Sequence, residues 1–283
     1  MSSPPEERAT LTTSDGCPIA YTLRRASHSN ATRLVLVHSL ALDERVWNGV
    51  VTKLKDDFDV LTYDCRGHGH SGRQASTYTT ELFARDLAEL LDTVGWQTAV
   101  VAGCSMGGNV AQAFAARHPA KTSALALIDT TAWYGEGAPE RWQERADSAS
   151  ARGLASLVDF QVMRWLGDEF RAAHPELVRA LVDVFLANDV RCYASACAMM
   201  GSADSRSYLS SLRMPVAVVV GEEDYATPVA SARFLHDAIA GSTMSIIPSA
   251  RHLTVVECPD RIADEIRALV RRLAPAASDP GLT

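Results

Sequence analysis

Short runs of β-branched and aliphatic residues alternate along this chain with longer segments in which apolar residues recur every three or four positions. The short runs have the length and continuous hydrophobicity of strands buried on both faces of a parallel sheet. They predict strands at residues 33–38, 59–63, 98–102, 124–128, 216–220 and 244–248. The periodic segments predict helices at residues 80–94, 110–117, 229–239 and 261–273, with residues 42–54 partly helical. This alternation predicts an α/β fold with a mostly parallel, doubly wound sheet.

Two parts of the chain depart from the alternation. Residues 10–13 and 19–24 predict a strand hairpin around the turn Ser14-Asp15-Gly16. Residues 133–209 carry no strand pattern and predict amphipathic helices that form a cap over the carboxyl ends of the strands. The predicted domains are therefore an α/β core of residues 1–132 and 210–283 and a helical cap inserted at 133–209. Residues 1–8 and 274–283 are expected to be frayed.

Composition narrows the class of protein. At 283 residues, with 47% hydrophobic and 22% charged residues, the chain can bury a large core. Its net charge of −7 argues against nucleic acid or an anionic membrane as a partner, and no apolar run approaches the roughly 20 residues that span a bilayer. The acidic, polar start of the chain does not resemble a signal peptide. The six cysteines lack the spacing of a disulfide framework or metal site, which predicts reduced thiols, a cytoplasmic location and no bound metal.

The strongest chemical signal lies at Gly103-Cys104-Ser105-Met106-Gly107, where a β-branched run stops and a helical pattern follows. A serine at a tight strand-to-helix turn has strained backbone and an exposed hydroxyl. Glycines two residues before and after it remove side chains that would collide as strand and helix approach. The helix N-terminus also favours negative charge near the serine. We therefore interpret Ser105 as a nucleophile at an elbow, and expect Cys104 to point away from the site as a small buried thiol.

A serine nucleophile needs a base, and a neutral imidazole needs a carboxylate that fixes its tautomer and stabilises its cation. His252 follows the last predicted strand and is the candidate base among the eight histidines. Asp224 lies just past the preceding strand and is the favoured acid. The order serine, acid, histidine is the one expected with such an elbow. The alternative acids are Glu222, Glu223 and Asp129.

An oxyanion hole needs two backbone N–H groups that point to one place. One is expected from Met106, directly after the nucleophile, and we assign the other to Leu40, in the loop after the strand at 33–38. The segment Gly67-His68-Gly69-His70-Ser71-Gly72 formally matches a dinucleotide motif, but no helix opens directly behind it. It therefore predicts a tight loop beside the site, and the sequence predicts no cofactor.

These motifs resemble those of the α/β-hydrolases, and the resemblance covers roughly residues 33–273. It rests on Gly103-x-Ser105-x-Gly107, Asp224, His252 and Tyr63-Asp64-x-Arg66-Gly67-His68-Gly69-x-Ser71. Within that superfamily the chain is most similar to the 3-oxoadipate enol-lactonases. The narrower resemblance is carried by Ser39-Leu40 with Asp43 and Trp47, by Arg66 to Ser71, by Val184-Phe185 and by Tyr193-Ala194-Ser195-x-Cys197. It implies hydrolysis of a small enol-lactone in aromatic-acid breakdown.

An anionic lactone requires a local cation in a protein of net charge −7, and the cap holds basic residues near aromatic ones. Arg145, Arg164 and Arg191 are the candidates for contact with a substrate carboxylate. Each has the alternative of lying on a solvated helix face. If none faces the site, the pocket is expected to be apolar, with walls such as Trp133, Tyr134 and Trp165.

The favoured function is a serine hydrolase that cleaves a small lactone or carboxylic ester through an acyl-enzyme. One alternative is a C–C bond hydrolase of ring-cleavage products, which shares the triad and the motif Gly103-x-Ser105-Met106-Gly107-Gly108. A broad carboxylesterase is another. A non-catalytic small-molecule receptor on the same fold is more remote, because the chain keeps a full triad. The natural substrate and a homo-oligomeric state stay open.

Overall fold

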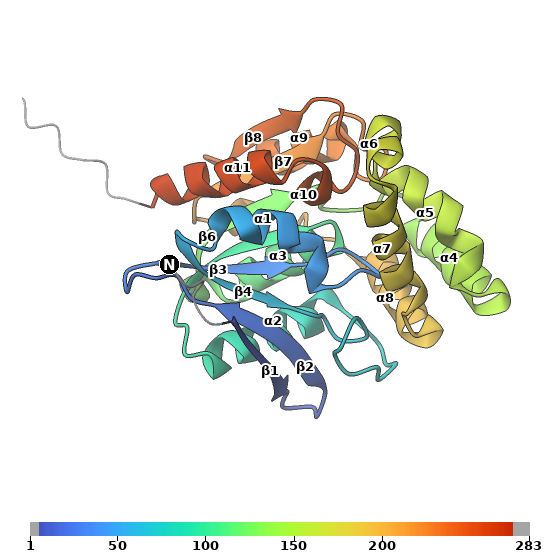
Figure 1. Cartoon of the computed structure of the whole chain (residues 1–283), viewed down its shortest axis with the longest axis horizontal. Helices are drawn as coiled ribbons and strands as arrows, with labels where there is room; N and C mark the ends of the chain where they lie inside the picture. Colours follow the sequence, from blue (N-terminus) through green and yellow to red (C-terminus); the bar gives the residue numbers. More distant parts are fainter. Residues whose placement is uncertain (1–5, 274–283) are drawn as a thin grey trace, which may run out of the picture.

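The computed structural model describes residues 6–273 and has one eight-stranded sheet at its centre (Figure 1). The strand order is β1-β2-β4-β3-β5-β6-β7-β8. All pairs among β3 to β8 are parallel, whereas β1 with β2 and β2 with β4 are antiparallel. The strands are β1 (Glu6–Thr12), β2 (Pro18–Arg24), β3 (Thr32–Val37), β4 (Phe58–Tyr63), β5 (Ala99–Cys104), β6 (Thr122–Ile128), β7 (Val216–Gly221) and β8 (Thr243–Ile247). The α/β fold with a mostly parallel sheet is thus confirmed.

Helices cover both faces of the sheet (Figure 1). Helix α1 packs beside α11, α2 packs beside α3, and α9 lies against β7 and β8. Because both faces are covered, the central strands can be apolar throughout, and every residue of β5 and β7 is buried. The helices of the core are α1 (Asn48–Leu54), α2 (Thr80–Thr93), α3 (Met106–Arg117), α9 (Val229–Ala238), α10 (Thr254–Glu257) and α11 (Pro259–Arg271), with 3-10 turns η1 (Glu44–Trp47), η2 (Pro119–Lys121) and η4 (Leu209–Ser211).

Between β6 and β7 the chain forms a separate layer of helices, and we call residues 133–209 the cap. Figure 1 shows this layer to the right of the sheet. Its helices are α4 (Ala138–Arg152), α5 (Val158–Trp165), α6 (Asp168–Ala173), α7 (Pro175–Leu186) and α8 (Val190–Ser202), with the 3-10 turn η3 (Leu154–Leu157). Helices α4 and α8 pack along each other. Within residues 6–273, no helix combines the length and the apolar character needed to cross a bilayer.

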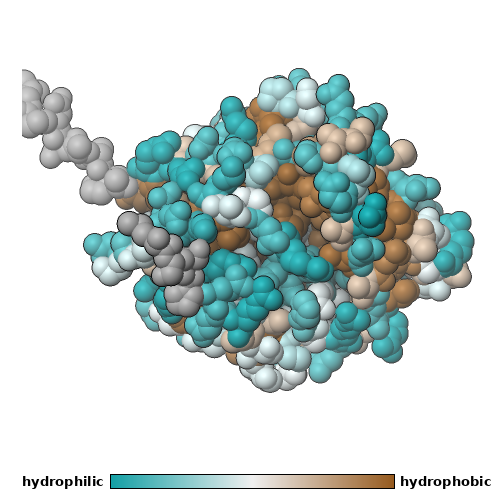
Figure 2. Space-filling model, in the orientation of Figure 1, coloured by the Kyte–Doolittle hydropathy of each residue, from teal (hydrophilic) through white to brown (hydrophobic). Residues whose placement is uncertain are grey.

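An apolar groove marks one junction of the cap with the core. Figure 2 shows brown side chains gathered in a hollow near the middle of this face, beside the position of α7 and α10 in Figure 1. The backbone N–H of Leu253 also donates to the carbonyl of Trp165 (2.9 Å), which ties the cap to the loop after β8. The apolar lining of the groove includes Val46, Phe170, Leu177, Leu181, Val255, Val256 and Pro259.

Several local predictions were wrong. Glu6 to Arg8 belong to β1 and are not frayed, because Glu6 pairs with Arg24 across the hairpin and its carboxylate accepts a hydrogen bond from Arg24 Nε (3.0 Å). Helix α3 begins at Met106 rather than Val110. Helix α10 was not predicted, because four residues are too few to show a helical period. The predictions for residues 1–5 and 274–283 fall outside the described residues.

Candidate active site

Ser105 lies where β5 ends and α3 begins. Its φ of 55° and ψ of −117° strain a residue that has a side chain. A Cβ on Gly103 would lie 2.1 Å from the carbonyl oxygen of Gly107, and one on Gly107 would lie 2.2 Å from that of Val37. Such distances exclude every residue except glycine unless the backbone moves. The two glycines therefore let the strand, the helix and the neighbouring β3 close around the turn that carries Ser105.

The imidazole of His252 links Ser105 to Asp224. Its Nε2 lies 2.8 Å from Ser105 Oγ, and its Nδ1 lies 2.8 Å from Asp224 Oδ2. Because an ionised carboxylate only accepts hydrogen bonds, the neutral ring carries its proton on Nδ1 and can accept the serine proton at Nε2. The three residues are buried, with 6%, 3% and 7% of Ser105, Asp224 and His252 exposed. This arrangement can remove the proton of Ser105 as its oxygen attacks a carbonyl carbon.

The turn after β7 stabilises the charge of Asp224. Its Oδ1 accepts the N–H groups of Ala226 (2.7 Å) and Thr227 (2.9 Å), and its Oδ2 accepts the Thr227 hydroxyl (2.8 Å). Burial opposes ionisation, but His252 and Thr227 outweigh it, so the pKa of Asp224 lies below its ordinary value. Asp224 is therefore ionised at neutral pH, as the partner of an imidazolium must be.

The alternative acids have other partners. Glu222 accepts the N–H of Ser249 (3.1 Å), and a carboxylate oxygen of Glu223 lies 3.6 Å from Nε of Arg251. Both carboxylates are thus engaged at the surface side of this turn. Of these two and Asp224, the carboxylate that contacts the His252 ring is that of Asp224.

Asp129, the last alternative acid, follows β6 and is fully buried. Its Oδ1 accepts the N–H of Gly221 (3.1 Å), and its Oδ2 accepts the N–H (2.9 Å) and the hydroxyl (2.7 Å) of Thr254. Burial, followed by the nearby charge of Asp224, raises the pKa of Asp129 well above its ordinary value. Asp129 therefore connects the chain just before Asp224 to the chain just after His252, without touching the imidazole.

Two N–H groups close to the nucleophile, those of Leu40 and Met106, donate to no protein acceptor within residues 6–273. Met106 begins α3, and the first N–H groups of a helix have no partner within it. Leu40 lies in the loop after β3 and lines the same cavity as Ser105. The cap fixes this loop through Asn188, whose side-chain amide donates to the carbonyl of Ala41 (2.8 Å). Both N–H groups are thus free to bind an oxyanion.

A cavity beneath the cap opens onto Ser105. The space between the cap and Ser105 that is free of protein atoms, open solvent included, is about 430 Å³. Its core side is lined by Ser39, Leu40, Ser105, Ala226, Thr227 and His252. Its cap side is lined by Tyr134, Trp142, Arg145, Gln161, Arg164, Trp165 and Met200.

The two arginines of this lining contact aromatic rings rather than carboxylates. Arg145 Nε donates to the hydroxyl of Tyr193 (2.6 Å), and its guanidinium carbon lies 5.4 Å from the ring centre of Phe160. That of Arg164 lies 4.9 Å from the same ring. Within the described chain neither arginine forms an ion pair. Burial, and then the charge of Arg145, lower the pKa of Arg164. The cavity therefore holds two positive charges that a bound anion would stabilise.

The family model for the α/β hydrolase fold matches residues 32–259, which is most of the chain and includes Ser105, Asp224 and His252. This chain belongs to the α/β-hydrolase family. The 3-oxoadipate enol-lactonase 2 of Acinetobacter baylyi is 29% identical over 93% of this chain and 96% of its own length. The crystal structure of an enol-lactonase from Burkholderia xenovorans LB400 superimposes with a TM-score of 0.88, at 32% identity over 93% of this chain and all of that one. A thermophilic esterase from Thermogutta terrifontis reaches a TM-score of 0.87 at 28% identity, over 95% of this chain and all of its own.

The relatives of this α/β hydrolase are named enol-lactonases and esterases, so the chain is an enzyme that acts on ester bonds. Its Gly67–Gly72 segment forms a tight loop, in which the N–H of Gly67 donates to the carbonyl of Gly72 (2.8 Å). Cys104 is fully buried, as its position beside the nucleophile suggested. Within residues 6–273, no group of three or more His, Cys, Asp or Glu side chains is placed to hold a metal ion.

The structure of this hydrolase separates the cap residues that the sequence grouped together. Tyr134, Arg145, Arg164 and Trp165 line the cavity. Arg191 does not, because it stands at the exposed start of α8, where 78% of its side chain is accessible and it pairs with Asp189 (3.3 Å). Trp133 is also absent from the lining: its backbone bridges to Asp204, and its ring stacks on the guanidinium of Arg206, 3.8 Å away.

Sequence reasoning missed Trp142, Gln161 and Met200, which do line the cavity. Trp142 precedes Arg145, and Gln161 precedes Arg164, by one helical turn on α4 and α5. Residues three apart share a helix face. A prediction that places the two arginines at the cavity therefore also places Trp142 and Gln161 there. Gln161 is 3% exposed, and no protein partner for its amide lies within residues 6–273. Met200 had no comparable signal.

Proposed function

We propose that this enzyme is a serine hydrolase that cleaves a small lactone or carboxylic ester by an acyl-enzyme mechanism, and that it resembles 3-oxoadipate enol-lactonases in its substrate. The observation that carries the proposal is the continuous chain of hydrogen bonds from Ser105 through His252 to Asp224 at the base of the cavity beneath the cap. The names of its relatives support the lactone or ester as the bond cleaved.

In the proposed mechanism, Ser105 Oγ attacks the carbonyl carbon while His252 Nε2 takes the serine proton. Asp224 stabilises the resulting imidazolium, and the N–H groups of Leu40 and Met106 bind the oxyanion. Collapse of the tetrahedral intermediate breaks the bond to the leaving oxygen, which His252 protonates. From an enol-lactone this oxygen leaves as an enol that tautomerises to a ketone. Water, deprotonated by His252, then releases the acyl group as a carboxylate and restores Ser105.

We further propose that the substrate carries a carboxylate, which Arg145 and Arg164 bind together with the Gln161 amide. The support is that both guanidinium groups line the cavity without an ion pair in the described chain, and that Gln161 lines the same cavity. The similar esterase from Thermogutta terrifontis has a malate-bound structure, and malate is a dicarboxylate.

The test is a pair of substrates of similar length, one anionic and one neutral: mono-4-nitrophenyl glutarate and 4-nitrophenyl valerate. Arg145→Met and Arg164→Met should each raise KM for the anionic hemi-ester by roughly ten- to a hundredfold, because a charge-assisted bond to a carboxylate contributes about 1.5–3 kcal/mol. The neutral ester should be nearly unaffected. Arg191→Met is the matched control, because that arginine lies outside the cavity.

Two outcomes would redirect the proposal. If all three variants treat both esters alike, the enzyme is an esterase for uncharged acyl groups, a reading that the aromatic walls at Tyr134, Trp142 and Trp165 favour. If wild-type enzyme cleaves dienone acids but neither lactones nor esters, it is a C–C hydrolase. A cytoplasmic location and breakdown of an aromatic acid stay predictions.

A further inference from the structure

We propose that His38 is a positioning residue for the oxyanion hole: its ring holds the Ser39–Leu40 peptide so that the Leu40 N–H points at the reacting carbonyl. This inference rests on the proposed function and adds to it a residue outside the triad. His38 follows β3 directly and is fully buried, and the sequence motifs assigned it no role.

The hydrogen bonds of the ring determine its tautomer. The backbone N–H of Cys65 points to Nε2 of His38 at 2.8 Å, and a backbone N–H can only donate. Nε2 must therefore be the bare nitrogen. Nδ1 carries the proton and donates it to the carbonyl oxygen of Ser39, 2.8 Å away. Burial lowers the pKa of His38, which keeps the ring neutral and the tautomer fixed.

The carbonyl that receives this proton belongs to the same peptide unit as the Leu40 N–H. All peptide bonds described are trans, so the C=O and the N–H of one unit point in opposite directions. The hydrogen bond from His38 fixes the direction of the Ser39 carbonyl. Because the peptide unit is planar, it thereby also fixes the Leu40 N–H, which points the opposite way. It also withdraws electron density from the unit, which makes its N–H a stronger donor to a developing oxyanion.

A competing anchor acts on the same carbonyl. The N–H of Leu42 donates to Ser39 O at 3.2 Å, closing a turn in which Ala41 has a φ of 57°. The His38 bond is the shorter of the two. The His38 ring also forms a hydrogen bond outside the loop, because Cys65, whose N–H it accepts, lies in the chain after β4. His38 therefore ties the loop to the neighbouring strand, which the turn by itself does not do.

The experiment compares four proteins on 4-nitrophenyl valerate: wild type, His38→Leu, His38→Asn and His68→Leu. Asparagine can place its amide nitrogen where His38 has Nδ1, so it restores the donor to Ser39. His68 is the matched control: it is buried beside His38, with ring centres 5.1 Å apart, and its Nδ1 lies 3.0 Å from a carbonyl outside the oxyanion loop, that of Arg66. The readouts are kcat, KM, Tm and the affinity of butylboronic acid, which forms a tetrahedral adduct with a reactive serine.

His38→Leu should lower kcat about ten- to a hundredfold, somewhat less than the loss of a whole oxyanion donor, with KM within about threefold. Boronate affinity should fall in parallel. His38→Asn should retain kcat within about fivefold of wild type, and His68→Leu should lose stability but little kcat. The inference is overturned if His38→Leu keeps its kcat, if His68→Leu loses as much, or if asparagine gives no rescue.

A measurement that needs no turnover separates this inference from the proposed function. The 15N shifts of the His38 ring in unliganded wild type should show the proton on Nδ1, and an Nε2–H tautomer would overturn the inference even in an active enzyme. Absence of Ser105-dependent ester hydrolysis would instead remove the proposed function. If His38→Leu fails to fold, the asparagine variant and the ring shifts still decide the question.

Discussion

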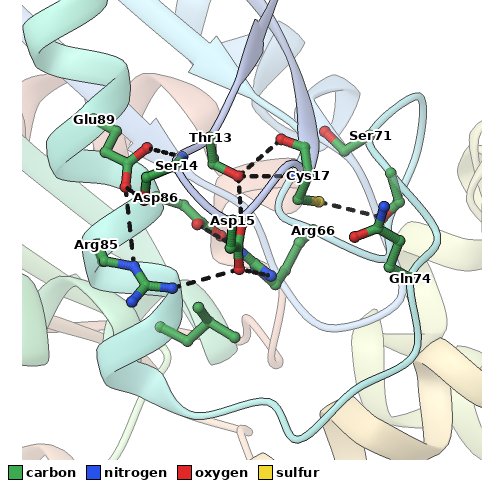
Figure 3. Close-up of polar contacts among 12 residues, drawn as sticks. Thr13, Ser14, Asp15, Cys17, Arg66, Ser71, Gln74, Arg85, Asp86 and Glu89 are labelled. Carbon is green, nitrogen blue, oxygen red and sulfur yellow. Dashed lines mark hydrogen bonds and ion pairs between the residues drawn. The ribbon is translucent and has the colours of Figure 1, made fainter.

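Arg66 lies in a buried network of ion pairs outside the lining of the active-site cavity, whereas Arg145 and Arg164 line that cavity. The surroundings of these arginines differ. Arg66 donates to both carboxylate oxygens of Asp86 (2.6 Å each) and to Asp15 (3.0 and 3.2 Å). Figure 3 shows it enclosed by these acids, between the turn of the β1–β2 hairpin and α2. The cavity arginines contact aromatic rings and have no ion pair in the described chain.

The comparison shows how one residue type serves stability in one place and recognition in the other. Burial lowers the pKa of Arg66, but Asp86 and Asp15 outweigh it and raise the pKa above its ordinary value. For Arg164, burial and the like charge of Arg145 both lower the pKa. In the network the charge of Arg66 is paired within the folded protein. In the cavity the arginine charges have no ion pair in the described chain, as is common in sites that bind ligands. Variants in the cavity should therefore change activity, and variants in the network should change stability.

The largest effect is expected at the base of the cavity. Ser105→Ala should lower kcat by about 10⁶, because removal of a triad nucleophile leaves only binding and the oxyanion hole. Tm should stay close to that of wild type, since the hydroxyl contributes little packing. Steady-state kinetics and a thermal melt test both parts. Activity within tenfold of wild type would show that another group is the nucleophile.

Asp224→Asn should have the next largest effect. An amide favours the wrong imidazole tautomer, and a comparable change in a serine protease lowers kcat by roughly 10⁴. Glu223→Gln is the control, one residue away in the same turn but paired with Arg251. Equal losses in the two variants would show that the acid is misassigned. A loss restricted to Asp224→Asn would place the chemistry in the hydrogen bond to His252.

On the network side, Arg66→Met should reduce the free energy of unfolding by about 3–5 kcal/mol, because Asp86 is left buried and unpaired. Replacing both residues, as Arg66→Met with Asp86→Leu, should recover much of this loss. Denaturant titration measures both, and kcat of the folded protein should change by less than about tenfold. A stable Arg66→Met protein with severely reduced kcat would contradict the division between network and cavity.

The sequence predicted that these three residues lie together because each follows a strand, and the carboxyl ends of parallel strands lie at one edge of the sheet. Ser105, Asp224 and His252 could thus be placed together without knowing any packing. The cap offered no such rule. Arg191 and Arg164 both lie on amphipathic helices, and only the packing of those helices decides which one faces the cavity.

Contacts between residues far apart in the chain could also not be predicted from the sequence. Arg66 meets Asp86 and Asp15 at separations of 20 and 51 residues, and the loop that carries Arg66 has no periodic pattern. The ring of His38 is oriented by the N–H of Cys65, 27 residues away. Such bonds depend on which strands pair and on how their loops meet, and neither motif spacing nor hydrophobic period contains that information.

The smallest effect is expected for Arg191→Met. This variant sharpens the comparison because Arg191 lies neither in the buried network of Arg66 nor in the cavity. Its side chain is mostly accessible and pairs with the helix-capping Asp189. Exposed ion pairs contribute little, and surface substitutions usually change stability by less than about 0.5 kcal/mol. The variant should therefore match wild type in Tm and, on both the anionic and the neutral ester, in KM. A rise in KM confined to the anionic ester would mean that the start of α8 reaches the substrate, so that the cavity as described is too small. Kinetics of Arg191→Met beside Arg145→Met, measured on the same two esters, decide the point.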